Sequence, residues 1–271
     1  MADGAVRRFQ GRDGLELAYR EVGSGRTLIL IHGFTLTAKA AWLDTGIAGR
    51  IAGHGYRVVL PDLRGHGDSA KPHDAASYPP DVLVDDGLAL IEQLGVTDYD
   101  LAGYSLGGRT VAQLLARGAS PRRAVVAGQG LEAILHTEGR GGRLRHILAN
   151  FGTFPPDSPE RAMEAWITAS GGDPAALIRV LDTFVDTPRE ALAAVTVPTL
   201  VLTGTEDGHN ETAAALASTF PQGQYMILPG DHFMAVNSPQ FTAKIINFLT
   251  RRELVLEDRA GGRAPGSSGG Q

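Results

Sequence analysis

The chain has 271 residues, which suits one large α/β domain or two small ones. Apolar residues make up 43% and charged residues 20%, so a sizeable core can form. The formal net charge of −5 is spread without long runs, which argues against binding nucleic acid or a membrane surface through a basic face. Because the chain has no cysteine, disulfides and thiolate metal sites are excluded.

No stretch of the sequence resembles a targeting or membrane-spanning segment. The N-terminal residues 1–8 lack the apolar run of a secretory signal, and no later segment is long and apolar enough to span a bilayer. We therefore expect a cytoplasmic protein without membrane or nucleic-acid partners, either a monomer or a homodimer.

The first part of the chain alternates predicted strands and helices. Residues 5–10 and 15–21 form a predicted hairpin around a Gly-Arg-Asp-Gly turn. The apolar run at 27–31 indicates a strand that is buried on both faces. The elements predicted next are a helix over about 40–52, a strand over 56–60, a loop over 63–79 and a helix whose apolar face is Val84, Leu88, Ile91 and Leu94.

The alternation breaks between residues 129 and 190, after a short predicted strand at 123–127. This segment holds glycine clusters, a Pro-Pro pair and helical patterns around 162–167 and 175–184. We interpret 129–190 as an inserted lid, and we predict that Phe154 and Trp166 are among its residues that line a substrate pocket.

Regular alternation then returns up to a polar end. The later elements are predicted strands at 198–202 and 224–228, a helix near 211–219 and a last helix with Phe241, Ile245, Phe248 and Leu249 on its apolar face. Strands that alternate with helices imply a mostly parallel sheet covered on both faces. The predicted organisation is a core of residues 1–128 and 191–256, the lid, and a disordered Gly/Ser/Arg-rich tail at 257–271.

The most informative motif is Gly103-Tyr104-Ser105-Leu106-Gly107, which reads G-x-S-x-G. A strand precedes it and a helical pattern follows, which is the context of a nucleophile elbow. Such a sharp turn forces the serine into a strained backbone conformation, and the glycines allow strand and helix to approach closely. Ser105 is therefore the candidate nucleophile.

A serine nucleophile needs a base, and the base needs an orienting acid. Active groups gather at the carboxyl ends of parallel strands. Asp207 follows the strand at 198–202 and His232 follows the strand at 224–228, which gives the order Ser, Asp, His expected with this motif. Several alternatives stay open: Glu206 as the acid, His209 as the base, and Asp207 as a helix cap. Asp231 is expected to cap a turn.

An acyl-transfer intermediate also needs N–H donors for its oxyanion. The Leu106 N–H is one candidate and the Phe34 N–H, after the strand at 27–31, is the other. The side chains of Phe34 and Tyr104 are predicted to line the substrate pocket. The segment 62–69, Asp-Leu-Arg-Gly-His-Gly-Asp-Ser, could hold a metal or phosphate. We interpret it instead as support for the turn that carries the Phe34 N–H, which we call the oxyanion segment.

These motifs together resemble the α/β-hydrolase superfamily over about residues 5–251. They are His32-Gly33-Phe34, the segment 62–69, the elbow with Gly108, and the pair Gly204-Thr205-Glu206-Asp207 with Gly230-Asp231-His232. The resemblance implies a mostly parallel eight-stranded sheet with helices on both faces and a helical lid after the sixth strand. It also implies Ser105 as nucleophile, His232 as base and Asp207 as acid.

The resemblance narrows the reaction without fixing it. Dehalogenase and epoxide hydrolase relatives carry an aspartate at the elbow, where this chain has Ser105, so those reactions are disfavoured. The sequence predicts a serine hydrolase of the carboxylesterase or lactonase type, acting on a small, largely apolar molecule without cofactor or metal. The alternatives are a C–C bond hydrolase or lyase on the same residues, or a ligand receptor with slow turnover.

Overall fold

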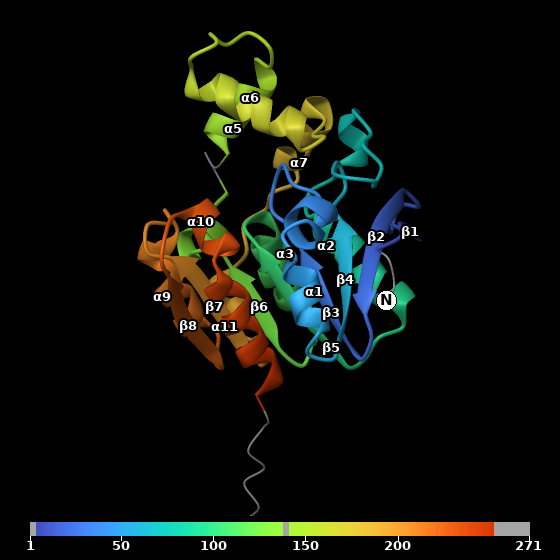
Figure 1. Ribbon diagram of the computed structural model, residues 1–271, viewed down its shortest axis with the longest axis vertical. Helices are drawn as coiled ribbons and strands as arrows, with labels where there is room; N and C mark the ends of the chain where they lie inside the picture. Colours follow the sequence, from blue (N-terminus) through green and yellow to red (C-terminus); the bar gives the residue numbers. More distant parts are fainter. Residues whose placement is uncertain (1–3, 138–140, 252–271) are drawn as a thin grey trace, which may run out of the picture.

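A computed structural model describes residues 4–137 and 141–251. Its centre is an eight-stranded sheet in the order β1-β2-β4-β3-β5-β6-β7-β8 (Figure 1). Strands β3 to β8 run parallel, whereas β2 pairs antiparallel with both β1 and β4. The predicted hairpin and the mostly parallel sheet are confirmed. The strands are β1 (Arg7–Gln10), β2 (Glu16–Gly23), β3 (Arg26–Ile31), β4 (Tyr56–Asp62), β5 (Tyr99–Tyr104), β6 (Ala124–Ala127), β7 (Thr199–Gly204) and β8 (Gly223–Leu228).

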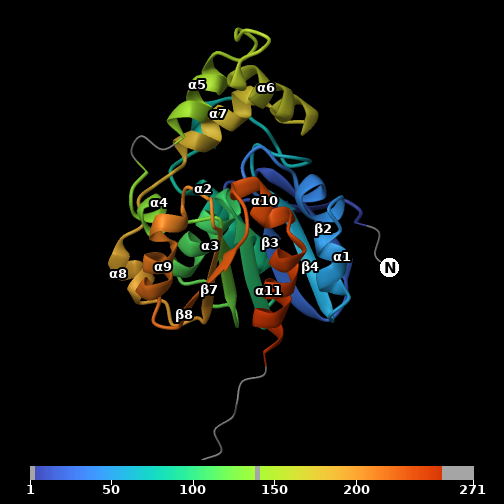
Figure 2. The same ribbon diagram turned by 60° about the vertical axis from the view of Figure 1, so that its left-hand side comes forward.

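Helices cover both faces of this sheet (Figures 1 and 2). Strands β5, β6 and β7 are buried along their whole length, as expected for parallel strands between two helical layers. One layer holds α1 (Ile47–Ala52), α10 (His232–Asn237) and α11 (Pro239–Thr250). The other holds α2 (Val82–Leu94), α3 (Leu106–Ala116), α4 (Leu131–Leu135), α8 (Arg189–Ala193) and α9 (Asn210–Thr219).

The helix predicted over 40–52 is wrong as a single element. The structure has a π-helical turn, η1 (Lys39–Leu43), and then α1, with a break between them. Gly46 has φ 71°, a left-handed conformation that a right-handed helix cannot contain. The loop over 63–79 is irregular as predicted, apart from a short 3-10 turn, η2 (Ala75–Ser77).

Three helices lie above the carboxyl ends of the strands, and we call them the cap helices (Figures 1 and 2). They are α5 (Gly142–Ala149), α6 (Pro159–Ala169) and α7 (Pro174–Asp182). The Ser158 and Asp173 side chains accept hydrogen bonds from the first N–H groups of α6 and α7, and each helix has proline at its first position. Leu148, Ile167, Leu177 and Leu181 form a small apolar core between them.

The first helix of the segment predicted as a lid, 129–190, packs in a core layer, and α8 crosses the predicted boundary between lid and core at residue 190. Helix α4 packs on α9, and α8 packs on α3 and α9. Their apolar side chains, such as Ile134 and Leu192, are fully buried in the larger core cluster. The predicted tail at 257–271 lies outside the described residues.

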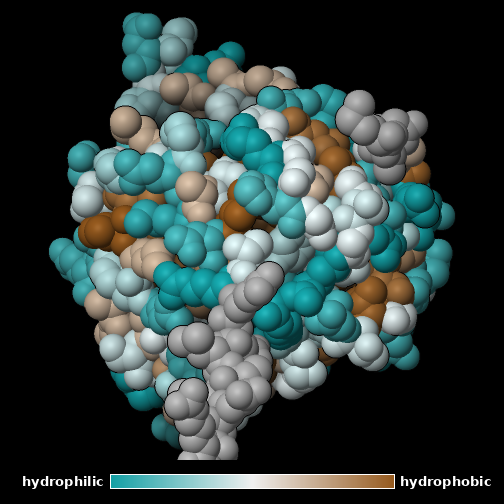
Figure 3. Space-filling model, turned by 60° about the horizontal axis from the view of Figure 1, so that its bottom comes forward, coloured by the Kyte–Doolittle hydropathy of each residue, from teal (hydrophilic) through white to brown (hydrophobic). Residues whose placement is uncertain are grey.

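The surface on the side opposite the cap helices is mainly hydrophilic, with small, separate hydrophobic patches (Figure 3). Helix α10 carries two of the most exposed large apolar side chains: Phe233 is 58% exposed and Met234 is 63% exposed. Within the described residues, no helix is long and apolar enough to cross a membrane.

Candidate active site

Ser105 occupies the sharp turn between β5 and α3. Its backbone has φ 56° and ψ −117°, a combination that side chains strongly disfavour. A Cβ added to Gly103 would lie 2.2 Å from the Gly107 carbonyl oxygen, and one added to Gly107 would lie 2.1 Å from the Ile31 carbonyl oxygen. Strand and helix therefore approach as closely as the G-x-S-x-G pattern predicts.

A continuous line of hydrogen bonds joins the three residues predicted as catalytic. His232 Nε2 lies 2.9 Å from Ser105 Oγ, and His232 Nδ1 lies 2.8 Å from Asp207 Oδ2. Ser105 follows β5, Asp207 follows β7 and His232 begins α10 after β8. The carboxyl ends of parallel strands thus bring together residues that are far apart in the sequence.

Asp207 is held as a carboxylate beside the imidazole. Its other oxygen accepts a hydrogen bond of 3.0 Å from the His209 N–H, and the side chain is buried. Burial acts to raise the pKa of Asp207, but the hydrogen bond and the charge of His232 outweigh it and lower the pKa below the ordinary value. An ionised acid in this place can hold the ring of His232 in one tautomer.

The alternative residues take other places. Glu206 is exposed, whereas Asp231 caps α10 by accepting hydrogen bonds of 2.8 Å from the N–H groups of Phe233 and Met234. His209 lies close to the site, with its ring centroid 5.9 Å from that of His232, but it is His232 that contacts Ser105 Oγ.

The segment after β3 lies beside the elbow. A Cβ added to Gly33 would lie 3.3 Å from Ser105 Cβ, and Thr35 has φ 63°, so the chain turns tightly here. Among the hydrogen bonds of the described residues, neither the Phe34 N–H nor the Leu106 N–H has an acceptor. Both donors are therefore available beside Ser105, and their role toward an oxyanion stays a prediction.

The 62–69 segment is held by contacts within the protein. The Asp62 carboxylate accepts hydrogen bonds from the Ala38 N–H at 2.7 Å and the Asp68 N–H at 3.0 Å. The buried guanidinium of Arg64 pairs with Asp13 and Asp86. The charged side chains of Asp62 and Arg64 thus bind other groups of the protein. This fits the interpretation of the segment as a support for the oxyanion segment.

Two buried histidines stand behind the oxyanion segment. His32 Nε2 accepts the Leu63 N–H at 3.1 Å, so its Nδ1–H donates to the Gly33 carbonyl oxygen at 2.8 Å. Burial lowers the pKa of His32, and burial together with the neighbouring His32 lowers the pKa of His66 to about 3. Both rings are therefore neutral at physiological pH.

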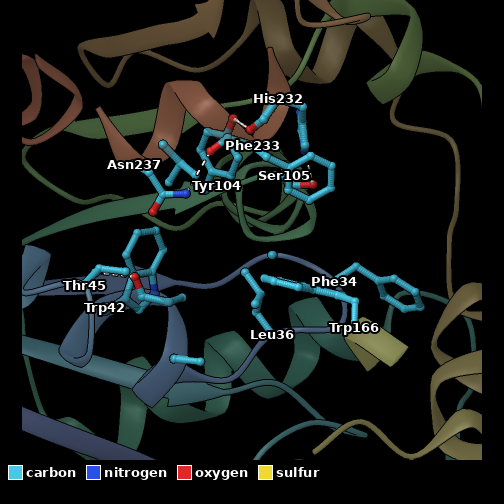
Figure 4. Close-up of a pocket in the computed structure, with 14 residues that line it drawn as sticks. Phe34, Leu36, Trp42, Thr45, Tyr104, Ser105, Trp166, His232, Phe233 and Asn237 are labelled. Carbon is cyan, nitrogen blue, oxygen red and sulfur yellow. Dashed lines mark hydrogen bonds between the residues drawn. The ribbon is translucent and has the colours of Figure 1, made fainter. Parts of the chain in front are cut away.

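Two cavities open on Ser105 from different sides. The smaller one has a volume of about 150 Å³ and lies between the elbow and α10 on one side and the oxyanion segment and Trp166 on the other (Figure 4). We call it the small chamber. Its lining is mostly apolar and is made of Gly33, Phe34, Leu36, Ala40, Ala41, Trp42, Thr45, Tyr104, Ser105, Trp166, His232, Phe233, Val236 and Asn237.

The larger cavity, which we call the large chamber, has a volume of about 430 Å³. Phe34 and Ser105 line both chambers, so they stand at the boundary. The other lining residues of the large chamber are Leu106, Arg109, Gln129, Ala133, Gly141, Leu144, Leu181, Phe184 and His209.

The predicted pocket residues divide accordingly. Phe34, Tyr104 and Trp166 line the small chamber, but Phe154 lines neither chamber. Instead, the Phe154 ring packs edge-on against His146, with centroids 5.5 Å apart. The prediction for Phe154 needs this correction, because composition shows how many apolar residues a lid carries and not which way each one faces.

Some residues near the site were missed in the sequence. Gly128 has φ 64°, and a Cβ there would lie 3.1 Å from His232 Cε1. The Gln129 amide donates to the Ser105 carbonyl oxygen at 2.7 Å, and the Tyr104 hydroxyl donates to the His232 carbonyl oxygen. The sequence feature that could have indicated Gly128 is its position directly after β6, at the same sheet edge as Asp207.

The comparisons agree with this architecture. A non-heme haloperoxidase of Rhodococcus erythropolis is 28% identical over 276 residues, which cover 88% of this chain and 97% of that protein. An esterase from Exiguobacterium antarcticum has a similar structure, with a TM-score of 0.73, 20% identity, and coverage of 91% of this chain and 100% of its own. A serine hydrolase involved in carbazole degradation gives a TM-score of 0.70 at 25% identity, with coverage of 92% and 100%.

The model of the alpha/beta hydrolase family matches residues 28–245, a span that runs from β3 into α11 and includes the elbow. The chain belongs to the α/β-hydrolase family.

Proposed function

We propose that this α/β hydrolase cleaves carboxylic ester or lactone bonds of a small, largely apolar molecule, with Ser105 as nucleophile, His232 as base and Asp207 as acid. The observation that carries the proposal is the hydrogen-bonded line from Ser105 Oγ through His232 to Asp207 at the strained elbow. The free N–H groups of Phe34 and Leu106 and the mostly apolar chambers support it.

The reaction follows from the positions of these groups. Ser105 Oγ attacks the carbonyl carbon while His232 Nε2 takes its proton, and the Phe34 and Leu106 N–H groups stabilise the oxyanion. His232 then returns the proton to the leaving alcohol oxygen as the C–O bond breaks. His232 Nε2 then takes a proton from a water molecule that attacks the acyl carbon, and it returns this proton to Ser105 Oγ as the bond from the acyl carbon to Oγ breaks and the acid leaves.

The test is the variant Ser105→Ala. We expect loss of ester hydrolysis by several orders of magnitude with the fold intact, because the three residues act as a unit. A fluorophosphonate should label the wild type at Ser105 and nowhere else, as read by mass spectrometry of the peptides. An active Ser105→Ala variant, or labelling at another residue, would reject the proposal, and saturable ligand binding without turnover would favour a receptor.

A second candidate activity is peroxide-dependent halogenation, because a relative matched along nearly its whole length is named a haloperoxidase. Hydrogen peroxide in place of water would convert the acyl-enzyme to a peracid, which then oxidises halide to hypohalous acid. Bromination of a dione in acetate buffer with peroxide and bromide tests this. If it requires the same intermediate, Ser105→Ala should abolish it together with esterase activity.

A further inference from the structure

The two chambers differ in which reacting groups they contact, and this difference gives them chemical roles. His232 lines the small chamber and, among the described residues, is absent from the lining of the large one. Leu106, which carries one of the two free N–H groups, lines the large chamber and not the small one. Ser105, at the boundary, lines both.

The identity of the proton donor then decides the orientation of an ester. The leaving alcohol oxygen must receive its proton from His232 Nε2, so that oxygen and its substituent lie on the side of His232. The acyl substituent of the tetrahedral intermediate points to the other side of Ser105. The small chamber therefore takes the alcohol part and the large chamber takes the acyl part.

Volume sets the size of each part. A cavity of about 150 Å³ is large enough for one benzene ring. The small chamber has that volume, whereas the large chamber has almost three times as much, about 430 Å³. Phe34, Leu144, Leu181 and Phe184 give the large chamber apolar and aromatic walls, while Arg109, Gln129 and His209 add polar groups.

On the basis of the proposed serine hydrolase function, we infer that the enzyme is selective for esters with a bulky, mainly apolar acyl group, larger than one ring, and an alcohol no larger than one ring. Leu144 on α5 and Val236 on α10 are the specificity-determining residues that this assignment singles out, one for each chamber. Trp166 and Phe233 cover the alcohol side.

A pair of isomers tests the assignment with reactivity held nearly constant. Methyl 2-naphthylacetate carries two rings on its acyl part, and 2-naphthylmethyl acetate carries the same rings on its alcohol part. We expect kcat/KM, followed by titration of released acid, to favour methyl 2-naphthylacetate by at least about tenfold, the scale on which apolar pockets discriminate size.

Variants link the preference to the chambers. Leu144→Phe should reduce the ratio of the two kcat/KM values by filling the large chamber, and Val236→Ala should reduce it by admitting more of the reversed isomer. Met163→Phe is the matched control, since Met163 packs in the cap core and lines neither chamber. It should leave the ratio unchanged.

Labelling of Ser105 by a small fluorophosphonate separates the possible failures. If Ser105 is labelled and a short ester is hydrolysed, but the isomers react equally, in the reverse order or not at all, the chamber assignment is wrong and the proposed function stands. The assignment is also wrong if Leu144→Phe and Val236→Ala leave the ratio unchanged in folded protein. If Ser105 is not labelled and neither isomer reacts, the proposed function fails and the assignment fails with it.

Discussion

Ser105 is fixed by its neighbours in a conformation that costs about 1–3 kcal/mol for a residue with a side chain. Its N–H donates to the Ala127 carbonyl oxygen at 2.9 Å, and its own carbonyl oxygen accepts from Arg109 N–H at 2.9 Å and from the Gln129 amide at 2.7 Å. These bonds tie the turn to β6 and α3. The hydroxyl is thereby presented to His232 before any substrate binds.

Substitutions can show that Asp207, and not the nearby Glu206 or Asp231, is the catalytic acid. Asp207→Asn should lower kcat by about 10⁴-fold, because an amide facing His232 Nδ1 stabilises the wrong tautomer. Glu206→Gln and Asp231→Asn should change kcat little, since Glu206 is exposed and asparagine caps a helix as well as aspartate does. Steady-state kinetics on one short ester checks all three, and a crippled Glu206→Gln enzyme would shift the acid to that residue.

Gly128 lies behind the imidazole and should be intolerant of a side chain. A Cβ there would lie 3.1 Å from His232 Cε1 and 3.0 Å from Tyr104 Cζ, in a backbone with φ 64°. Gly128→Ala should therefore displace His232 and lower kcat more than it raises KM. Gly118→Ala is a control for backbone strain alone, with φ 92° and no atom near its added Cβ. Equal kcat in both variants would contradict the positioning role of Gly128.

At the scale of elements, the cap contacts the oxyanion segment directly. Trp166 on α6 donates from Nε1 to Thr35 Oγ1 at 3.2 Å, and Thr35 follows Phe34. A second contact joins Asp173, which caps α7, to His73 in the 63–79 loop at 2.9 Å. The cap helices and the loops of the core thus share polar contacts at two places.

Loss of the Trp166 contact should affect turnover in graded steps. Trp166→Phe removes the N–H and part of the ring but keeps an aromatic side chain at this wall of the small chamber. A neutral hydrogen bond contributes about 0.5–1.5 kcal/mol, so kcat/KM should fall about two- to tenfold. The kcat/KM of Trp166→Ala should fall further, because this change also removes a wall of the small chamber. Phe154→Ala, which alters neither chamber, should retain the wild-type substrate preference. Wild-type kinetics for Trp166→Ala would show that the contact has no role.

At the scale of the whole molecule, folding buries ionisable groups that are neutral in the folded state. His32 and His66 lie under the oxyanion segment with almost no exposed surface, and their ring centroids are 5.1 Å apart. These two imidazole rings therefore bind protons more weakly in the folded protein than in the unfolded chain.

The free energy of unfolding should depend on pH for this reason. Because burial lowers the pKa of His66 to about 3, the folded state binds fewer protons than the unfolded state from there up to the ordinary value of 6.5. Stability should thus fall as pH drops below 6.5, by up to about 1.4 kcal/mol per pH unit for each such histidine. Urea unfolding between pH 7.5 and 5 should show a smaller slope for His66→Gln. The exposed-loop control His54→Gln should keep the wild-type slope, and an unchanged slope for His66→Gln would contradict this account.

The sequence by itself predicted the fold class and the residues that meet at Ser105, with Glu206 and His209 left open as alternatives. Apolar runs such as 27–31 are typical of strands between two layers, and the elbow glycines between a strand and a helical pattern favour a tight strand-to-helix turn. Since parallel strands end at one edge of the sheet, a serine, an aspartate and a histidine that follow such strands are expected to lie near one another. Local patterns and one topological rule therefore predict the contact of His232 with Ser105 and Asp207.

Only the tertiary structure decided what surrounds those residues. Helical periodicity shows that a cap helix has an apolar face, but the direction of that face depends on how the helix docks, so Trp166 lines a chamber and Phe154 does not. The need for glycine at 128 arises from His232 and Tyr104, which are distant in sequence. The division of the pocket into two chambers at Phe34 and Ser105 depends on side chains from both the core and the cap, and no local pattern encodes a space between elements.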